Sequence, residues 1–131
     1  MKLRMTGNSV RLRVGRSELA RFLQEGHIEE TIRFAPAPNP TFTWALVLGP
    51  PESAKAAVRY VPCDLAVVVT PEQVGLWRER DQVGIYSLVD LGHGRKLELI
   101  VEKDFACLHG SDSDDLDTFA NPNLAATCEV R

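Results

Sequence analysis

The chain repeats its own hydrophobic pattern after 55 residues, without a gap. Residues 12–48 and 67–103 place apolar side chains at the same points. The matched pairs are Leu12/Val67, Val14/Val69, Leu19/Val74, Phe22/Trp77, Ile28/Val83, Phe34/Val89, Phe42/Leu97, Trp44/Leu99 and Leu46/Val101. A repeated set of apolar positions predicts a repeated structural unit, and therefore a pseudo-symmetric fold.

Each copy has the pattern of a strand, a helix and two further strands. The best local signal is Thr70-Pro71-Glu72-Gln73, which predicts a helix start with a capping box. In the first copy, Ser17 can cap the helix and Gly26 can end it. Residues 65–69 are apolar on both faces, which predicts a central strand covered on both sides.

We therefore expect one α+β domain over residues 1–131. Two pseudo-repeated β-α-β-β units, about residues 10–48 and 65–103, would form a largely antiparallel curved sheet or half-barrel with two short helices. A β-hairpin precedes them, because Gly7-Asn8 between two alternating segments is a two-residue turn signal. Residues 104–131 follow as an irregular, loop-like acidic segment.

The composition limits where the protein is expected to be located and what it is expected to bind. The three cysteines, Cys63, Cys107 and Cys128, are odd in number and contain no close pair. The opening residues are too charged for a signal peptide, and no stretch approaches the ~18 apolar residues of a membrane span. These features predict a cytoplasmic protein with free thiols. The net charge of −3 argues against a general nucleic-acid binder.

The cations concentrate in the opening hairpin, residues 1–14, which we call the basic hairpin. Residues 1–21 hold six cations against Glu18, a net charge of +5. Lys2, Arg4, Arg11 and Arg13 alternate with apolar residues, so one face carries all four. Such a face suits an unknown protein or a small anionic ligand; the alternative is a solvated strand face. Nucleic acid is disfavoured because no aromatic side chains interleave with the cations.

The acidic segment holds a candidate metal site. Cys107 and His109 lie two residues apart, so in an extended chain both point to one side, and Asp112 and Asp114 could complete a zinc or calcium site. A free structural cysteine is the alternative, because no CxxC pair and no EF-hand loop accompany these residues. The segment could also lie across the basic hairpin and neutralise it, within one molecule or between two. We predict no catalytic residue and no definite cofactor.

Four stretches carry a resemblance. They are MKLRxxGNSxRLR at residues 1–13, DQVGI at 81–85, VEKDFACLH at 101–109 and FxNP at 119–122. They resemble a family of short, uncharacterised bacterial proteins. The resemblance implies that the acidic segment belongs to the domain, and it brings no activity. The paired units also resemble those of vicinal-oxygen-chelate proteins and cradle-shaped barrels, but apolar residues stand where the former place metal ligands.

The pattern as a whole favours a small cytosolic binding or accessory domain without catalysis. It would act through the basic hairpin or through a concave face between the two units. The alternative is a metal-binding protein or metal-dependent enzyme that uses Cys107, His109 and the following aspartates. A homodimer formed by pairing of sheet edges is a further alternative.

Overall fold

The structure is a computed structural model that describes residues 1–36, 38, 40–105 and 117–119. Its elements are β1 (Lys2–Thr6), β2 (Ser9–Val14), α1 (Arg16–Glu25), β3 (His27–Arg33), β4 (Thr41–Leu48), β5 (Ala57–Val61), β6 (Asp64–Val69), α2 (Pro71–Trp77), β7 (Gly84–Gly92) and β8 (Arg95–Lys103). The predicted α+β class with two similar units is confirmed, and β5, which the sequence did not predict, precedes the second unit as β1 precedes the first. Among the described helices, none is long and apolar enough to cross a membrane.

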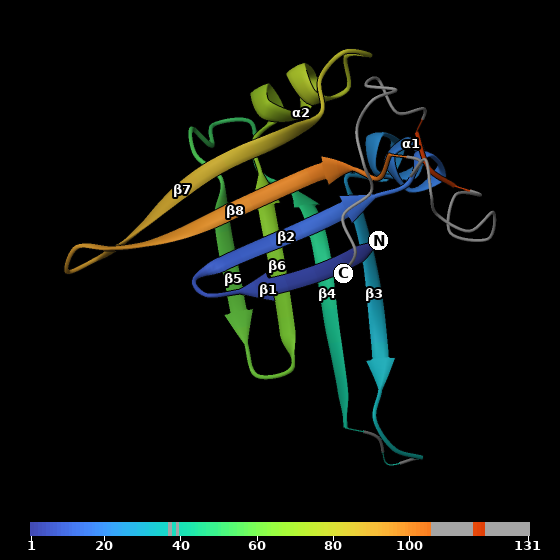
Figure 1. The fold of residues 1–131 in the computed structure, drawn as a ribbon, viewed down its shortest axis with the longest axis vertical. Coiled ribbons are helices and arrows are strands. Elements are labelled where there is room, and N and C mark those ends of the chain that lie inside the picture. The colour runs from blue at the N-terminus through green and yellow to red at the C-terminus, as the bar shows by residue number, and fades with distance from the viewer. Residues whose placement is uncertain (37, 39, 106–116, 120–131) are drawn as a thin grey trace.

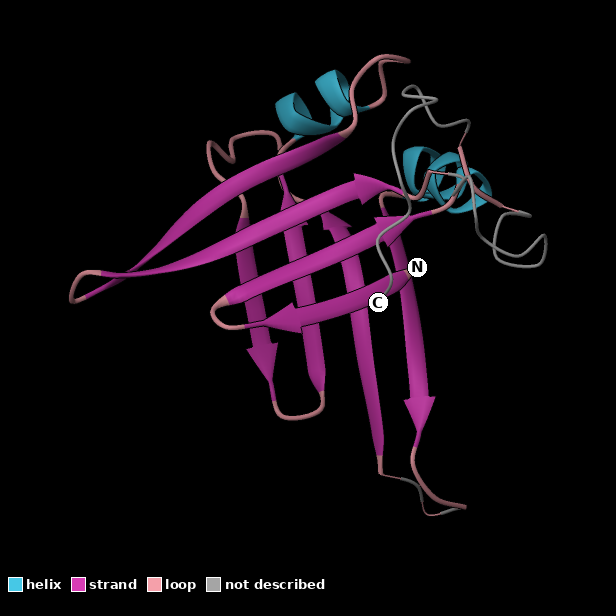
Figure 2. Cartoon of the chain, viewed as in Figure 1, coloured by secondary structure: helices cyan, strands magenta, loops and turns pink. Residues whose placement is uncertain are grey.

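The strands form two four-stranded sheets. Their orders are β1-β2-β8-β7 and β3-β4-β6-β5. In each sheet two antiparallel hairpins meet through a parallel central pair, β2 with β8 and β4 with β6. The sheets stack face to face with crossing strands, and both helices lie at one end of the stack (Figure 1, Figure 2).

Each unit gives one hairpin to each sheet. The first unit places β1-β2 in one sheet and β3-β4 in the other, and the second unit places β5-β6 and β7-β8 in the reverse order. The two units are therefore interlaced, and they are not separate lobes. The interface between them is the hydrophobic core itself. The sequence suggested a concave binding face between the two units. In the described residues, the hydrophobic core fills the space between the units instead.

The core consists largely of the predicted matched positions. Both members are buried in six of the nine pairs, which are Leu12/Val67, Val14/Val69, Leu19/Val74, Phe22/Trp77, Trp44/Leu99 and Leu46/Val101. The helices contribute the largest of these side chains. Phe22 from α1 and Trp77 from α2 are each only 1% exposed, and their ring centroids lie 6.5 Å apart. The repeat therefore places equivalent residues of the two units in direct contact.

One part of the repeat is displaced by two residues. Ile28 pairs with Leu46 on β4, whereas Ile85 pairs with Val101 on β8. Because Leu46 and Val101 are equivalent, the counterpart of Ile28 is Ile85, which is buried, and not Val83, which is 37% exposed. The offset is 57 residues here instead of 55. A shift of two residues keeps the same strand face, so the gap-free comparison could not detect it.

Local turn and cap signals behave as predicted at two places. Thr6 pairs with Ser9, and Gly7 has a φ of +57°, which confirms the two-residue turn of the basic hairpin. At the start of α2, the Gln73 N–H donates to Thr70 Oγ1 and the Thr70 N–H donates to Gln73 Oε1, each at 3.0 Å. The capping box is therefore present.

The start of α1 differs from the prediction, because the cap comes from the far end of the chain. Gly15 is the N-cap, and Ser17 lies inside the helix. The N–H and hydroxyl of Ser17 donate to the Asp117 carboxylate at 3.0 and 2.7 Å, and the Arg16 N–H donates to the Asp117 carbonyl at 2.9 Å. A Cβ on Gly15 would lie 2.6 Å from that carbonyl, so only glycine fits. The contact makes Asp117 part of the domain.

Strand β6 is central, but only one of its faces is covered. Leu65, Val67 and Val69 are buried in the core, whereas Ala66 and Val68 on the other face are half-buried. The prediction of two covered faces is therefore wrong. The helices lie at one end of the stack, and no described helix covers an outer face (Figure 1). Among the described residues, both outer faces are therefore free of a covering helix.

Removing the central aromatic contact should cost much of the stability. We expect Phe22→Ala to lower the free energy of unfolding by about 3–5 kcal/mol, because it leaves a cavity between α1 and α2. Urea denaturation measures this. Leu76→Ala is the matched control, since Leu76 is 61% exposed and its loss should change stability by less than ~0.5 kcal/mol. Equal effects of the two substitutions would contradict a core centred on Phe22.

The cap from Asp117 should make stability depend on pH. Hydrogen bonds from Ser17 hold the pKa of Asp117 below its usual value. The stabilisation is therefore complete above the unfolded pKa of about 3.9 and is lost as the pH falls through the lower folded pKa. Asp117→Ala should lower stability by about 1 kcal/mol at neutral pH and by less at about pH 3. Urea denaturation at both pH values checks this, with Glu52→Ala as the exposed control.

Candidate functional site

The four predicted cations lie together on the outer face of the β1-β2 hairpin. Lys2 pairs directly with Arg13, and Arg4 pairs directly with Arg11. The alternation of the sequence explains this, because the residues between them, such as Leu3, face the other sheet. Like charges placed directly opposite each other across two strands are destabilising. The arrangement therefore costs stability unless an anion compensates it.

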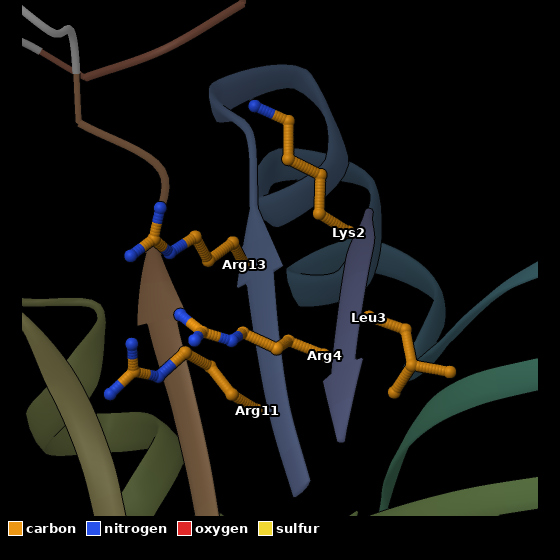
Figure 3. Close-up of a pocket in the computed structure, with 5 residues that line it drawn as sticks. All are labelled: Lys2, Leu3, Arg4, Arg11 and Arg13. Atoms are coloured by element: carbon orange, nitrogen blue, oxygen red, sulfur yellow. The ribbon is translucent and has the colours of Figure 1, made fainter. Parts of the chain in front are cut away.

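The same residues line a hollow of about 350 Å³, formed by Lys2, Leu3, Arg4, Arg11 and Arg13. In Figure 3 the three arginine side chains extend in one direction, toward β8, while Leu3 points to the opposite side of the hairpin. The site thus combines a cationic wall with the aliphatic stems of the arginines.

Two of the four cations are neutralised within the molecule. Lys2 Nζ lies 2.9 Å from Asp104 Oδ2, and Arg11 Nε lies 3.3 Å from Glu102 Oε1. Arg4 and Arg13 make no ion pair with any residue in the described part of the chain. These two guanidinium groups are therefore the ones available to an external anion. Asp104 is the first residue of the acidic segment, so that segment begins with a contact to the basic hairpin.

Arg11 is held by a polar chain that crosses three strands. The Tyr86 hydroxyl on β7 donates to Glu102 Oε2 on β8 at 3.0 Å, and the other oxygen of Glu102 pairs with Arg11 on β2. Partial burial raises the pKa of Tyr86, and the hydrogen bond to Glu102 and its negative charge raise it further. The phenol therefore stays protonated and donates at neutral pH. These contacts position the Arg11 side chain. Arg4 and Arg13 take no part in them, so their side chains can move toward a ligand.

A second hollow of about 350 Å³ lies on the outer face of the other sheet. It is lined by His27, Glu29, Ala45, Val47, Arg59, Tyr60, Val61, Asp64 and Ala66. One row across this sheet reads Glu29, Ala45, Ala66, Arg59, and the equivalent row of the first sheet reads Tyr86, Ile100, Arg11, Arg4. The two hollows share the equivalent pairs Arg4/Arg59 and Arg11/Ala66, but the first is lined by β1 and β2 alone, whereas the second extends over all four strands of its sheet.

The two hollows differ in charge. Arg4 and Arg59 are equivalent cations, but Ala66 lines the second hollow at the position where Arg11 lines the first. Glu29 and Asp64 place negative charge in the second hollow. Only the hollow on the basic hairpin is therefore purely cationic, and it is the better candidate for an anion.

The candidate metal ligands Cys107, His109, Asp112 and Asp114 lie outside the described residues. In the described ranges, no group of three or more His, Cys, Asp and Glu side chains is arranged to hold a metal ion. Cys63 is an exposed free thiol at the turn between β5 and β6. The metal site therefore stays a prediction from the sequence.

Three further residues shape the cationic site; sequence reasoning had placed Asp104 in the segment that could lie across the basic hairpin, but it missed Glu102 and Tyr86. The three residues come from β7, β8 and the residue after β8, which pack beside the basic hairpin only because β2 and β8 pair in parallel. Strand alternation would place Tyr86 and Glu102 on outer faces. Nothing local in the sequence indicates which sheet face they share with the arginines.

Comparison with known proteins gives one match. A family model described as "Family of unknown function (DUF7009)" matches residues 1–123. The match covers both sheets, both helices and Asp117. No curated protein and no solved structure matches the chain.

The polar chain across the sheet predicts a measurable shift in tyrosine titration. The protein has two tyrosines, so in the Tyr60→Phe variant Tyr86 is the only tyrosine whose titration is observed. In that background, Glu102→Gln should lower the pKa of Tyr86 toward its ordinary value, because the nearby negative charge is removed. Phenolate absorbance against pH measures this. Glu98→Gln, on the same sheet face, is the control that should leave the pKa unchanged; an unchanged pKa in Glu102→Gln would contradict the contact.

Proposed function

The chain belongs to the family of unknown function DUF7009, and we propose from the geometry of the basic hairpin that it is a non-catalytic domain that binds an anionic partner. The partner would sit in the hollow formed by Lys2, Arg4, Arg11 and Arg13. The odd number of cysteines favours a reducing compartment, so we place this activity in the cytoplasm.

One observation carries the proposal, which is that two cross-strand pairs of like charge stand side by side on an open sheet face. Like charges directly opposite each other across two strands are destabilising. Only Lys2 and Arg11 receive a compensating carboxylate from the described residues. A bound anion between Arg4 and Arg13 would relieve the remaining repulsion. The free energy gained by relieving this repulsion would then add to the free energy of the charge-assisted hydrogen bonds that the guanidinium groups donate to the anion.

A merely solvated face explains less of the arrangement. A solvated strand face needs polar side chains, but it does not need four cations without an interleaved acid. The equivalent hairpin of the other sheet, β5-β6, shows the contrast, because the residues that it gives to the second hollow include one cation, Arg59, and one acid, Asp64. The difference between the two faces arose at equivalent positions of one fold. The difference in charge therefore comes from the side chains at these positions and not from the arrangement of the strands.

The proposal predicts that two charge reversals abolish anion binding. Arg4→Glu with Arg13→Glu should weaken binding of inorganic tripolyphosphate at least about tenfold, since each charge-assisted contact contributes about 1.5–3 kcal/mol. Isothermal titration calorimetry of the full chain measures this, and circular dichroism verifies the fold.

The matched control is Arg21→Glu with Arg80→Glu, which changes the net charge equally at two exposed arginines away from the hairpin. Its affinity should stay within about twofold of the unmodified chain at physiological salt, where distant exposed charges are screened. An equal loss in both double variants would show that binding follows net charge alone. No binding by the unmodified chain would overturn the proposed function.

A further inference from the structure

We propose that the anionic partner is an extended acidic protein segment, which adds antiparallel to the free edge of β1 as a fifth strand of that sheet. This inference rests on the proposed function, because it names the partner of the same cationic site. It is carried by the position of β1 in the sheet, by the register of its hairpin and by the spacing of its side chains.

Strand β1 is an edge strand, since the sheet order is β1-β2-β8-β7. Thr6 and Ser9 close a two-residue turn, so this pair exchanges both hydrogen bonds. Alternation along the hairpin then directs the N–H and C=O groups of Leu3 and Met5 away from β2. No strand in the described ranges pairs with that side of β1. These groups are the template that a fifth strand requires.

The side chains of β1 define the sequence that such a strand needs. Leu3 and Met5 would form the hydrogen-bonded pairs with it, and Lys2 and Arg4 would face its residues in the non-hydrogen-bonded pairs, where Cα atoms are only about 4.5 Å apart. Lys2 and Arg4 repeat every second residue, about 6.8 Å along the strand. Acidic residues at alternate positions of the partner therefore match both cations.

The other face of β1 favours apolar residues between those acids. Leu3 faces the core side and is half-buried, and Met5 on the same face is 58% exposed at the end of the strand. An apolar residue beside Met5 would cover it. The complementary segment therefore alternates acidic with apolar side chains. That pattern is itself the pattern of a half-buried strand.

Cations on an edge strand also keep it from pairing with another copy of itself, which is a common function of edge lysines. That function alone would explain Lys2 and Arg4. It does not explain Arg11 and Arg13, which lie one strand further in and stand directly opposite the first two. The second row of cations lies within reach of the carboxylates of an added strand. The same edge thus repels a like strand and attracts an acidic one.

The other three edges of the two sheets lack this combination. The outward residues of β7 include Tyr86 and Asp90, those of β3 include Glu29, and β5 has a single cation, Arg59. Among the described edge strands, only β1 carries cations at two successive positions of one face, Lys2 and Arg4. The inference therefore applies to one edge and predicts one orientation of the partner's acidic face.

The test uses seven-residue peptides and the full chain, with fluorescence anisotropy as the measurement. One peptide alternates glutamate with valine, and the second has the same composition with its glutamates contiguous. We expect the alternating peptide to bind about tenfold more tightly, because only it presents acids to both cations in an extended conformation. Arg4→Glu should remove this preference, and Arg21→Glu should leave it unchanged.

N-methylation of the peptide separates strand addition from charge attraction. Methyl groups on the valine amides, which face β1 in the predicted register, should weaken binding about tenfold, because two main-chain hydrogen bonds are lost. Methyl groups on the glutamate amides, which face away, are the matched control and should change little.

Each outcome decides between the two proposals. Equal binding of the alternating and the contiguous peptide, or equal effects of the two methylation patterns, overturns strand addition. Binding of tripolyphosphate without binding of any acidic peptide also overturns it and leaves the anion-binding function standing. If the unmodified chain binds neither tripolyphosphate nor peptide, both proposals fail.

Discussion

The contact between Phe22 and Trp77 holds the two halves of this chain together. The rings are equivalent in the repeat, each is 1% exposed, and they meet where α1 and α2 approach each other. Because each unit places one hairpin in each sheet, neither unit can bury its apolar faces alone. Most hydrophobic stabilisation is therefore gained only when both units are in place. The two copies of the repeat therefore share one hydrophobic core.

The interlaced topology also decides what the outer faces look like. Parallel pairing of β2 with β8 and of β4 with β6 joins residues of different units into continuous rows across each sheet. Each outer face carries a hollow of about 350 Å³, which lies on β1-β2 in one sheet and extends over all four strands in the other. The charged residues that line the first hollow are all cations, whereas the second hollow is lined by charges of both signs and by alanines. The same backbone thus supports two different surfaces, and the difference between them lies in a few side chains.

The C-terminal segment is a structural part of this arrangement. Asp104 pairs with Lys2 at the edge of the cationic site, and Asp117 caps α1. Directly before Asp104, buried Lys103 at the end of β8 donates to the Glu79 carbonyl at 2.8 Å and lies 5.5 Å from the centre of the Phe119 ring. Burial lowers the pKa of this lysine. The segment therefore connects both helices to the edge that carries the cations.

Periodicity in the sequence determined the kind and order of every element except β5, most of the matched core positions, the turn at Gly7 and the face shared by the four cations, because these depend on local patterns. Only the tertiary structure decided which hairpins share a sheet, that β7 is displaced by two residues, and that Tyr86 and Glu102 stand beside Arg11. The physical reason is that period-2 alternation specifies a strand face but not its neighbour, so long-range pairing has no local signature.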